Sequence, residues 1–211
     1  MDKARAARVM AALEELYPEA KPELNFRNPY ETLIATILSA QCTDKRVNIV
    51  TSRLFPEYPD AFAMAKLTPE ALEPMIRECG LYHNKARNIV AASRALVERY
   101  NGEVPSTRAE LMALPGVGQK TAGVVLLAAF GDDQIPVDTH VFRVSRRIGL
   151  SDGSTPEKVE QQLRELLPQE IWSHGHHLII WHGRRCCHAR KPECERCPLN
   201  DGLCEKNLEE K

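Results

Sequence analysis

Four cysteines near the C-terminal end of the chain have the spacing of metal ligands. Cys187, Cys194, Cys197 and Cys204 are separated by six, two and six residues. Thiolates bind zinc and iron, and a Cys-x-x-Cys step at the centre of such a run indicates a metal centre. Structural zinc usually has two Cys-x-x-Cys pairs, whereas one compact run of four also suits a cubane iron–sulfur cluster. The spacing alone therefore leaves both metals open.

Other candidate ligands surround this run. Cys186 is an alternative to Cys187 as the first ligand, and five histidines lie between His174 and His188. Four cysteines already complete a ligand set, so we do not assign the histidines to the metal. Cys42 and Cys79 are far away in sequence, and we expect them to be small buried core residues. Arg184, Arg185, Arg190 and Lys191 make the same segment basic, which suits either contact with a phosphate backbone or a solvated loop.

A second chemical feature is the stretch LPGVGQKTAGVVL, Leu114 to Leu126. Leu114 precedes a proline and so ends one helix, and Gly116 and Gly118 permit a tight turn before an apolar helix. The free N–H groups at the start of that helix form a site for one phosphate. An ordinary helical turn is the alternative interpretation.

Lys120 lies in the first turn of this helix, and Asp138 begins the next predicted helix, eighteen residues later. A helix N-terminus disfavours an ammonium group, so we expect the pKa of Lys120 to fall below its usual value of about 10.4. A neutral amine is a nucleophile, and a carboxylate beside it can accept its proton. Two simpler roles remain open: Lys120 binds a phosphate, and Asp138 caps its helix.

The composition of the chain limits the fold class and the kind of surface that can carry these sites. The chain has 211 residues, of which 43% are hydrophobic and 6% aromatic, which favours an all-α protein of one or two domains. A net charge of −1 means that any DNA-binding surface is a local arrangement of charges. The first residues, MDKARAARVMAALEEL, contain no continuous apolar segment. We expect a cytoplasmic protein without a membrane segment, nucleoid-associated if bacterial, with reduced thiols rather than disulfides.

Capping residues divide the chain into roughly ten helices and no convincing strand. Asn28, Thr43, Thr68, Ser106 and Thr155 each precede a helical pattern and are predicted N-caps. Further helices are predicted for residues 2–17, from near residue 84, and from residue 136. No linker rich in Gly or Ser marks a domain boundary.

The glycine stretch, the following VDTHVFRVSRRIG and the terminal cysteine run together resemble the endonuclease III family of helix-hairpin-helix DNA glycosylases. The resemblance covers nearly the whole chain, including LSAQCTD, GLYHNKARNI and NGEVP. It implies two lobes: a six-helix bundle at residues 22–132, with the hairpin at about 106–130, and an iron–sulfur domain at residues 1–21 and 133–211. Residues 187–204 would then hold a [4Fe–4S] cluster.

The resemblance also implies an activity, namely removal of oxidised pyrimidines followed by cleavage 3′ to the abasic site by β-elimination. Lys120 would attack C1′ to form a Schiff base, with Asp138 handling protons. Gln41 and Leu81 would fill the space left by the extruded nucleotide. The partner would be double-stranded DNA with damaged pyrimidines or abasic sites, bound by a monomer. The implied DNA contacts are Gln41, Leu81, Gly116, Val117, Gly118, His140, Arg143, Arg184 and Lys191.

Three positions depart from the family pattern. The interval before Cys204 is six residues where the family usually has five, Gln119 replaces a common arginine, and Gly123 replaces a common asparagine. The first requires one extra residue of loop between two ligands, and the others lie beside the chemistry. Two alternatives follow: a related glycosylase with another lesion preference or weak lyase activity, and a non-catalytic DNA-binding iron–sulfur module.

Overall fold

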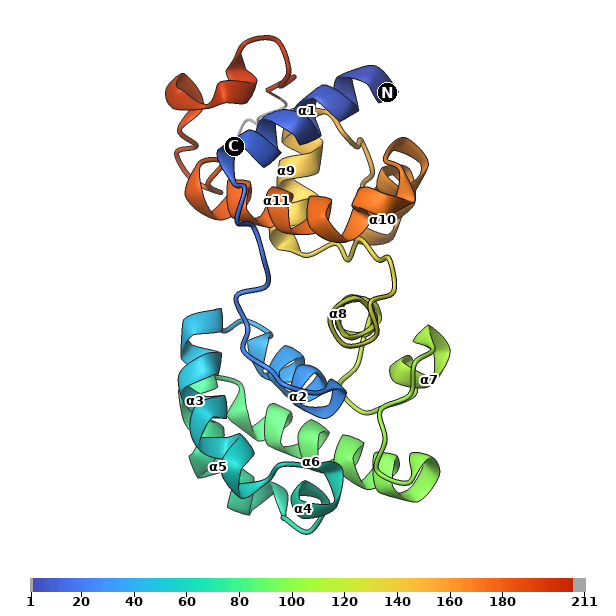
Figure 1. Ribbon diagram of the computed structural model, residues 1–211. Coiled ribbons are helices and arrows are strands. Elements are labelled where there is room, and N and C mark those ends of the chain that lie inside the picture. Colours follow the sequence, from blue (N-terminus) through green and yellow to red (C-terminus); the bar gives the residue numbers. More distant parts are fainter. Residues whose placement is uncertain (1, 207–211) are drawn as a thin grey trace. The chain divides into compact units, whose positions relative to one another are not determined.

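The computed structural model describes residues 2–206, and every regular element within this range is a helix (Figure 1). The predicted all-α class is therefore confirmed. No helix in this range is both long and apolar enough to cross a membrane. The described chain forms two compact bodies. We call residues 22–132 the hairpin body, and residues 2–21 together with 133–206 the terminal body.

The hairpin body consists of seven α-helices and one short 3-10 helix. Its elements are α2 (Pro29–Ser39), α3 (Asp44–Glu57), α4 (Ala61–Ala65), α5 (Pro69–Ile76), η1 (Arg77–Cys79), α6 (Tyr82–Tyr100), α7 (Arg108–Met112) and α8 (Gln119–Phe130). Helix α2 is the central element, because it contacts α3, α6 and α8. Every residue from Tyr30 to Leu38 is buried, as the nearly all-apolar sequence of this helix predicts.

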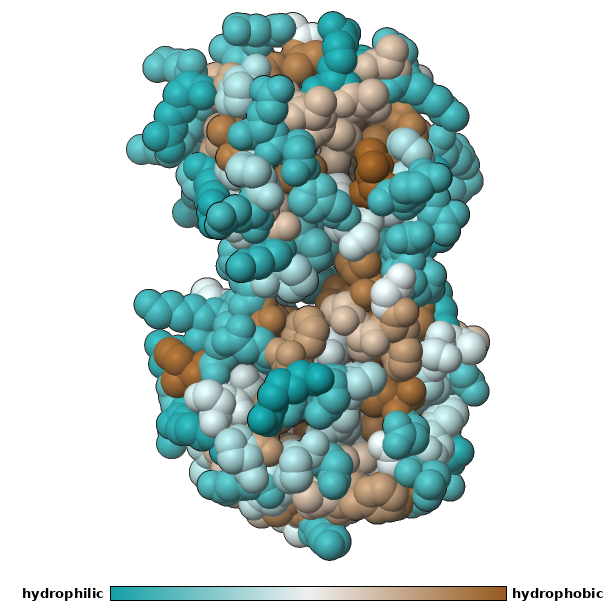
Figure 2. Space-filling view, in the orientation of Figure 1, coloured by the Kyte–Doolittle hydropathy of each residue, from teal (hydrophilic) through white to brown (hydrophobic). Residues whose placement is uncertain are grey.

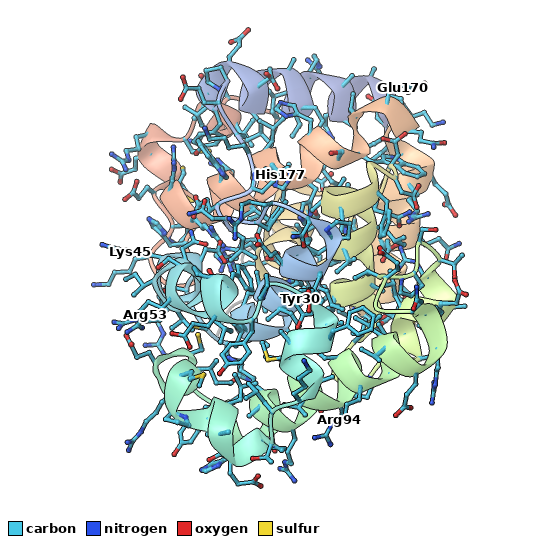
Figure 3. All side chains as sticks on the ribbon, turned by 60° about the horizontal axis from the view of Figure 1, so that its bottom comes forward. Tyr30, Lys45, Arg53, Arg94, Glu170 and His177 are labelled. Carbon is cyan, nitrogen blue, oxygen red and sulfur yellow. The ribbon has the colours of Figure 1, made fainter. Side chains whose placement is uncertain are left out.

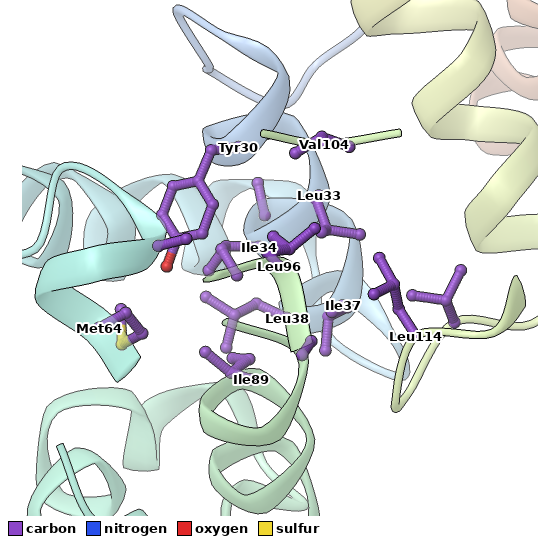
Figure 4. Packing of buried hydrophobic residues seen from close by; sticks show 14 of the residues in the cluster. Tyr30, Leu33, Ile34, Ile37, Leu38, Met64, Ile89, Leu96, Val104 and Leu114 are labelled. Atoms are coloured by element: carbon purple, nitrogen blue, oxygen red, sulfur yellow. The ribbon is translucent and has the colours of Figure 1, made fainter. Parts of the chain in front are cut away.

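Apolar side chains from most of these helices form one core (Figure 4). Leu33, Ile34 and Leu38 of α2 pack with Ile89 and Leu96 of α6. Lys45 and Arg53 instead extend outward from α3 (Figure 3). The hairpin body thus has the buried apolar core that a domain of this size needs for its own stability.

Side-chain caps set the starts of five helices in this body. Asn28, Thr43 and Thr68 accept hydrogen bonds from backbone N–H groups of α2, α3 and α5, as predicted. The prediction of Ser106 was wrong by one position, because Thr107 caps α7. Helices α6 and α8 start at Leu81 and Gly118 without a side-chain cap hydrogen bond.

The terminal body is built from both ends of the described chain. Its elements are α1 (Lys3–Leu16), α9 (Thr139–Ile148), α10 (Pro156–Leu166), η2 (Gln169–Ile171), α11 (Trp172–Arg185), η3 (Cys194–Arg196) and η4 (Pro198–Asn200). Figure 1 shows α1 beside α11, and α11 packs in turn against α9. Helix α9 begins at Thr139 rather than at residue 136, and Thr155 caps α10 as predicted.

Residues 186–206, which we call the cysteine loop, contain only the two short helices η3 and η4. Arg5 of α1 fastens the end of this loop by donating hydrogen bonds from Nη1 to the carbonyls of Ile148 and Leu203, both at 2.9 Å. The loop therefore depends on side-chain contacts and on its cysteines more than on helical hydrogen bonding.

Candidate DNA-lesion site and metal centre

Helices α7 and α8 form the hairpin that the glycine stretch predicts. The turn between them is fixed by backbone hydrogen bonds from Leu114 N to Leu111 O at 3.0 Å and from Val117 N to Leu114 O at 3.2 Å. The side chains of Leu114 and Val117 are buried in the core of the hairpin body. Val117 therefore belongs to the turn as an apolar anchor whose N–H is bonded within the turn, and its contact with DNA stays a prediction.

The two glycines of the turn differ in how tightly their surroundings constrain them. Gly116 has a φ of +78°, and a Cβ there would lie 2.7 Å from Cβ of Asn88 on α6. Both the left-handed backbone and the close approach exclude a larger residue. Gly118 is the N-cap of α8, and an added Cβ there would have no neighbour within 4 Å among the described residues. The start of α8 thus presents free N–H groups to an anion.

Lys120 is the second residue of α8, and its side chain is exposed. Arg108, at the start of α7, donates a hydrogen bond from Nη1 to Oε1 of Gln119 at 3.0 Å. A guanidinium group is therefore held beside the start of α8, next to Gln119. Arg108 is a candidate contact that the sequence analysis missed, and only the hairpin geometry reveals it.

Gln41 and Leu81 both lie next to helix ends of the hairpin body. Gln41 follows α2 with a φ of 53°, and Leu81 precedes α6 with a φ of 48°. Apolar residues reach the surface in separate patches (Figure 2), and Leu81 is the most exposed of the large hydrophobic side chains described, at 53%. An exposed leucine on a fixed turn is suited to insertion between bases.

Asp138 is the N-cap of α9 in the terminal body. Its Oδ1 accepts hydrogen bonds from the backbone N–H groups of His140 and Val141, both at 2.8 Å. Asp138 therefore caps α9, and Oδ1 alone accepts both capping hydrogen bonds. The second oxygen, Oδ2, is the atom available for proton transfer in the catalytic interpretation.

Arg143 contacts the start of the cysteine loop, and His140 lies against Gly183 of α11 within the terminal body. Burial lowers the pKa of His140, helped by the positive charges of Arg143 and Arg184 and opposed by Asp138. Arg143 donates from Nη2 to Gly183 O at 2.9 Å and from Nε to Cys187 O at 3.2 Å. Arg143 thus binds the backbone beside the cysteines, while its DNA contact stays a prediction.

The basic residues of the last helix and the loop differ in exposure. Arg184 is half-buried, whereas Lys191 is exposed on a turn with a φ of 53°. Arg185 lies over the ring of Trp181, 3.7 Å from its centroid. Of these side chains, Lys191 is the one most available to a phosphate, and the contacts of both Arg184 and Lys191 with DNA remain predictions.

The cysteines of the loop share one small cavity of about 30 Å³. Its lining includes Cys186 and the four predicted ligands, Cys187, Cys194, Cys197 and Cys204. Arg147 also lines it, donating to His188 O at 2.6 Å and to Cys187 Sγ at 3.8 Å. Arg147 follows Arg143 by four residues on α9, so both arginines reach this loop from one helix face.

His182 is the histidine that lies closest to this chemistry. Its Nε2 is 3.7 Å from Cys197 Sγ, and its Nδ1 is 3.2 Å from the hydroxyl of Tyr17. Burial lowers the pKa of His182 to about 4, so its ring is neutral at pH 7. The ligand atoms of His182, Cys186 and Cys197 lie within 4.8 Å of one another, a group that the sequence analysis did not predict.

The donor set fits an iron–sulfur cluster. Four thiols of the predicted set converge, and N–H groups approach their sulfurs, as Lys206 N does toward Cys204 Sγ at 3.3 Å. Burial raises the pKa of the Cys204 thiol, and a bound cation such as iron would stabilise its thiolate. Cys186 is buried in the same cavity, where its Sγ lies 3.8 Å from Glu193 O and within 4.8 Å of Cys197 Sγ, so it stays an alternative ligand.

Two family models match this chain. One, described as the HhH-GPD superfamily of base excision DNA repair proteins, matches residues 34–169. The other, described as the iron-sulfur binding domain of endonuclease III, matches residues 187–204, the span of the four predicted ligands. Endonuclease III from Escherichia coli (strain K12) is 47% identical over 205 residues, which is 97% of each chain. Endonuclease III from Synechocystis sp. is 48% identical over 198 residues, which is 93% of this chain and 90% of the relative.

Solved structures show the same likeness. A non-covalent endonuclease III–DNA complex superposes with a TM-score of 0.94 at 47% identity, covering 98% of this chain and 96% of the other. A trapped endonuclease III–DNA covalent intermediate gives the same TM-score and identity over 98% and 97% of the two chains. A thermostable thymine-DNA glycosylase, at 24% identity and a TM-score of 0.86, shares the fold.

Proposed function

The chain belongs to the endonuclease III family of base excision DNA repair glycosylases, and on that premise we propose that it removes oxidised pyrimidines from duplex DNA through Lys120. The enzyme class is a bifunctional DNA glycosylase and abasic-site lyase with an iron–sulfur cofactor, so the alternative of a non-catalytic module is excluded. The proposal adds the lesion class, the roles of individual residues, a monomer, and a cytoplasmic, DNA-associated location.

The observation that carries the assignment is the start of α8. An exposed lysine lies in the first turn of a helix whose N-terminal N–H groups have no side-chain cap. Such a helix start binds a phosphate of the DNA backbone and holds the strand near the amine. The same element therefore positions the DNA strand and supplies the nucleophile, so the amine and the sugar are held close to a reactive geometry.

A residue of this chain is assigned to each step of the proposed reaction. The damaged nucleotide leaves the base stack, and Gln41 and Leu81 occupy the space that it vacates. The Lys120 amine attacks C1′ as the bond from C1′ to the base breaks and the base departs with a proton. Ring opening then gives a Schiff base between Lys120 and the sugar.

Strand cleavage completes the sequence. Loss of a proton from C2′ expels the 3′ phosphate by β-elimination, and water then hydrolyses the Schiff base to release Lys120. Asp138 serves as the proton acceptor and donor in these transfers, since its Oδ2 is separate from the two capping bonds. The α9 cap holds the carboxylate in a fixed orientation.

Cys187, Cys194, Cys197 and Cys204 would hold a [4Fe–4S] cluster, which supplies a structural crosslink when bound. Arg143 and Arg147 hold the backbone of the loop around these ligands. The iron–sulfur domain would then comprise residues 1–21 and 133–211, and its exposed Lys191 would contact phosphate. None of the reaction steps needs a ligand position on the metal.

Borohydride trapping tests the proposal. Wild-type protein incubated with a duplex containing thymine glycol and then reduced should form a covalent protein–DNA adduct, and Lys120→Ala should form none. A panel of lesions run in the same way ranks substrates. An adduct that persists in Lys120→Ala would remove Lys120 as the nucleophile, and base release without any adduct would indicate a glycosylase with weak lyase activity.

A further inference from the structure

Gln41 and Leu81 lie on two turns that share an unusual backbone conformation. Both are non-glycine residues in the left-handed region, with φ values of 53° and 48°. This conformation costs free energy for a residue with a side chain and persists only where the surroundings impose it. Contacts of the surrounding residues must therefore impose the left-handed conformation on both turns.

Lys85 connects the segments that lead into these two turns. Its Nζ donates hydrogen bonds to Leu38 O at 2.8 Å and to Cys79 O at 2.7 Å. Leu38 lies three residues before Gln41, and Cys79 lies two residues before Leu81. The backbone N–H of Lys85 also donates to Leu81 O at 3.0 Å. One residue of α6 thus contacts both segments.

The surroundings of Lys85 argue against a simple surface role. The residue is 4% exposed, and burial lowers its pKa, while the neighbouring thiols of Cys79 and Cys42 raise it. Lysine is almost never fully buried unless its charge has partners, because removing an ammonium group from water is costly. Because the Lys85 ammonium group is nevertheless buried, its two hydrogen bonds must offset the cost of removing it from water.

A helix cap for α2 explains only half of this arrangement. Leu38 O lies in the last turn of α2, where a donor is useful, but Cys79 ends the separate element η1. The thiols of Cys42 and Cys79 also interact across the same two segments. The hydrogen bond from Lys85 to Cys79 O and the contact between the Cys42 and Cys79 thiols therefore join the two turns to each other.

We propose that Lys85 is a positioning residue that fixes Gln41 and Leu81 relative to one another, so that both enter the duplex together when the nucleotide is extruded. The inference rests on the proposed function, because it assigns Lys85 to the DNA-opening step. It predicts that Lys85 matters for duplex substrates and not for the chemistry at the sugar.

The chain offers matched controls for this role. Ser93 lies on the same helix, is fully buried, and its Oγ is 3.1 Å from the hydroxyl of Tyr30. Ser93→Ala therefore removes a buried hydrogen bond of α6 that touches neither turn. Glu78 holds η1 from outside through ion pairs with Arg46 and Arg53, and Glu78→Gln tests whether these exposed pairs matter.

The experiment compares single-turnover cleavage of one abasic strand, free and within a duplex. Lys85→Met should lose about tenfold on the duplex and keep its rate on the single strand, since losing tenfold corresponds to the usual cost of misplacing a buried polar contact. Ser93→Ala and Glu78→Gln should change both rates by the same small factor. Lys85→Gln, which retains a donor, should fall between Lys85→Met and wild type, and it carries the test if Lys85→Met does not fold.

A double-variant comparison isolates the mechanism. In a Gln41→Ala, Leu81→Ala background, Lys85→Met should cause no further loss on the duplex, because the side chains that it positions are gone. A 2-aminopurine opposite the abasic site should also brighten less with Lys85→Met than with wild type at saturating protein. Equal losses on both substrates, or an undiminished loss in the double-alanine background, would overturn the inference. A wild-type protein that cleaves neither substrate would instead refute the proposed function.

Discussion

The two bodies of this protein hold their functional residues in different ways. In the hairpin body, Gln41, Leu81 and Lys120 lie at helix ends on a scaffold with a large apolar core. In the terminal body, the cysteine loop has two short helices and is tied to α1 and α9 by arginine side chains. Burial of apolar surface orders the first set, and we expect the cysteine loop to depend on its metal as well.

The difference extends to the two helix starts that are proposed to do chemistry. Helix α8 starts at a glycine without a side-chain cap, which leaves its N–H groups for a phosphate. Helix α9 starts at Asp138, whose side chain occupies two of its N–H groups. We expect the start of α8 to bind the substrate, whereas the start of α9 orients a carboxylate.

Loss of a metal ligand should have the largest effect and should distinguish the two bodies. Cys197→Ser should lose the visible absorbance at about 400 nm, become sensitive to proteolysis within residues 186–206, and lose activity. A protease-resistant fragment spanning the hairpin body should persist. Limited proteolysis followed by mass spectrometry measures both outcomes.

Cys186→Ser is the matched control for the ligand assignment. It changes a buried thiol of the same cavity that is outside the predicted set, so the protein should keep its colour. Colour that survives in Cys187→Ser but disappears in Cys186→Ser would exchange these two residues in the ligand set.

Replacing Lys120, the proposed nucleophile, should remove activity without changing stability. Lys120 is exposed, so Lys120→Ala should change the free energy of unfolding by less than about 0.5 kcal/mol. Its strand cleavage should fall to the rate of DNA without enzyme, because no other amine is placed at this helix start. Chemical denaturation and single-turnover kinetics provide the two measurements, and a large loss of stability would contradict the view that the scaffold is independent of the site.

Asp138→Asn should separate capping from catalysis. Asparagine caps a helix about as well as aspartate, so the thermal midpoint should stay close to that of wild type. Loss of proton transfer should lower the single-turnover rate by about 10²–10⁴-fold. Asp138→Ala should show the same rate and, in addition, lose about 1 kcal/mol of stability. A normal rate in Asp138→Asn would leave Asp138 with the cap alone.

The smallest effect is expected at Arg108. Arg108→Ala removes the guanidinium beside Gln119 and should weaken DNA binding a few-fold while reducing the salt dependence by about one phosphate contact. Lys66→Ala, an exposed change just after α4, should leave both quantities unaltered. Equal salt slopes for wild type and Arg108→Ala would show that Arg108 does not contact the backbone.

Local features of the fold could be predicted from the sequence. Asn28, Thr43, Thr68 and Thr155 cap helices because capping depends on a few consecutive residues. The same local rule misplaced one cap at Ser106, since Thr107 beside it is an equally good acceptor. The glycine turn and the four-cysteine run were found in the same way, because spacing carries both signals.

Contacts between distant residues could not be predicted. Lys85 reaches back 47 residues to Leu38, and Arg147 reaches forward 41 residues to His188. Nothing in the spacing of the sequence indicates these partners, since they depend on how helices pack. The sequence gives no reason to assign His182 to the metal, because four cysteines already complete a ligand set, yet packing brings its ring beside Cys197.

Identifying the residue that bonds to DNA tests the role of Lys120 most directly. Wild-type protein is trapped with borohydride on an abasic duplex, digested with a protease and a nuclease, and analysed by tandem mass spectrometry. If Lys120 is the nucleophile, the sugar remnant should be attached to the peptide containing Lys120, at that lysine. Attachment to any other lysine or to the N-terminal amine would contradict it.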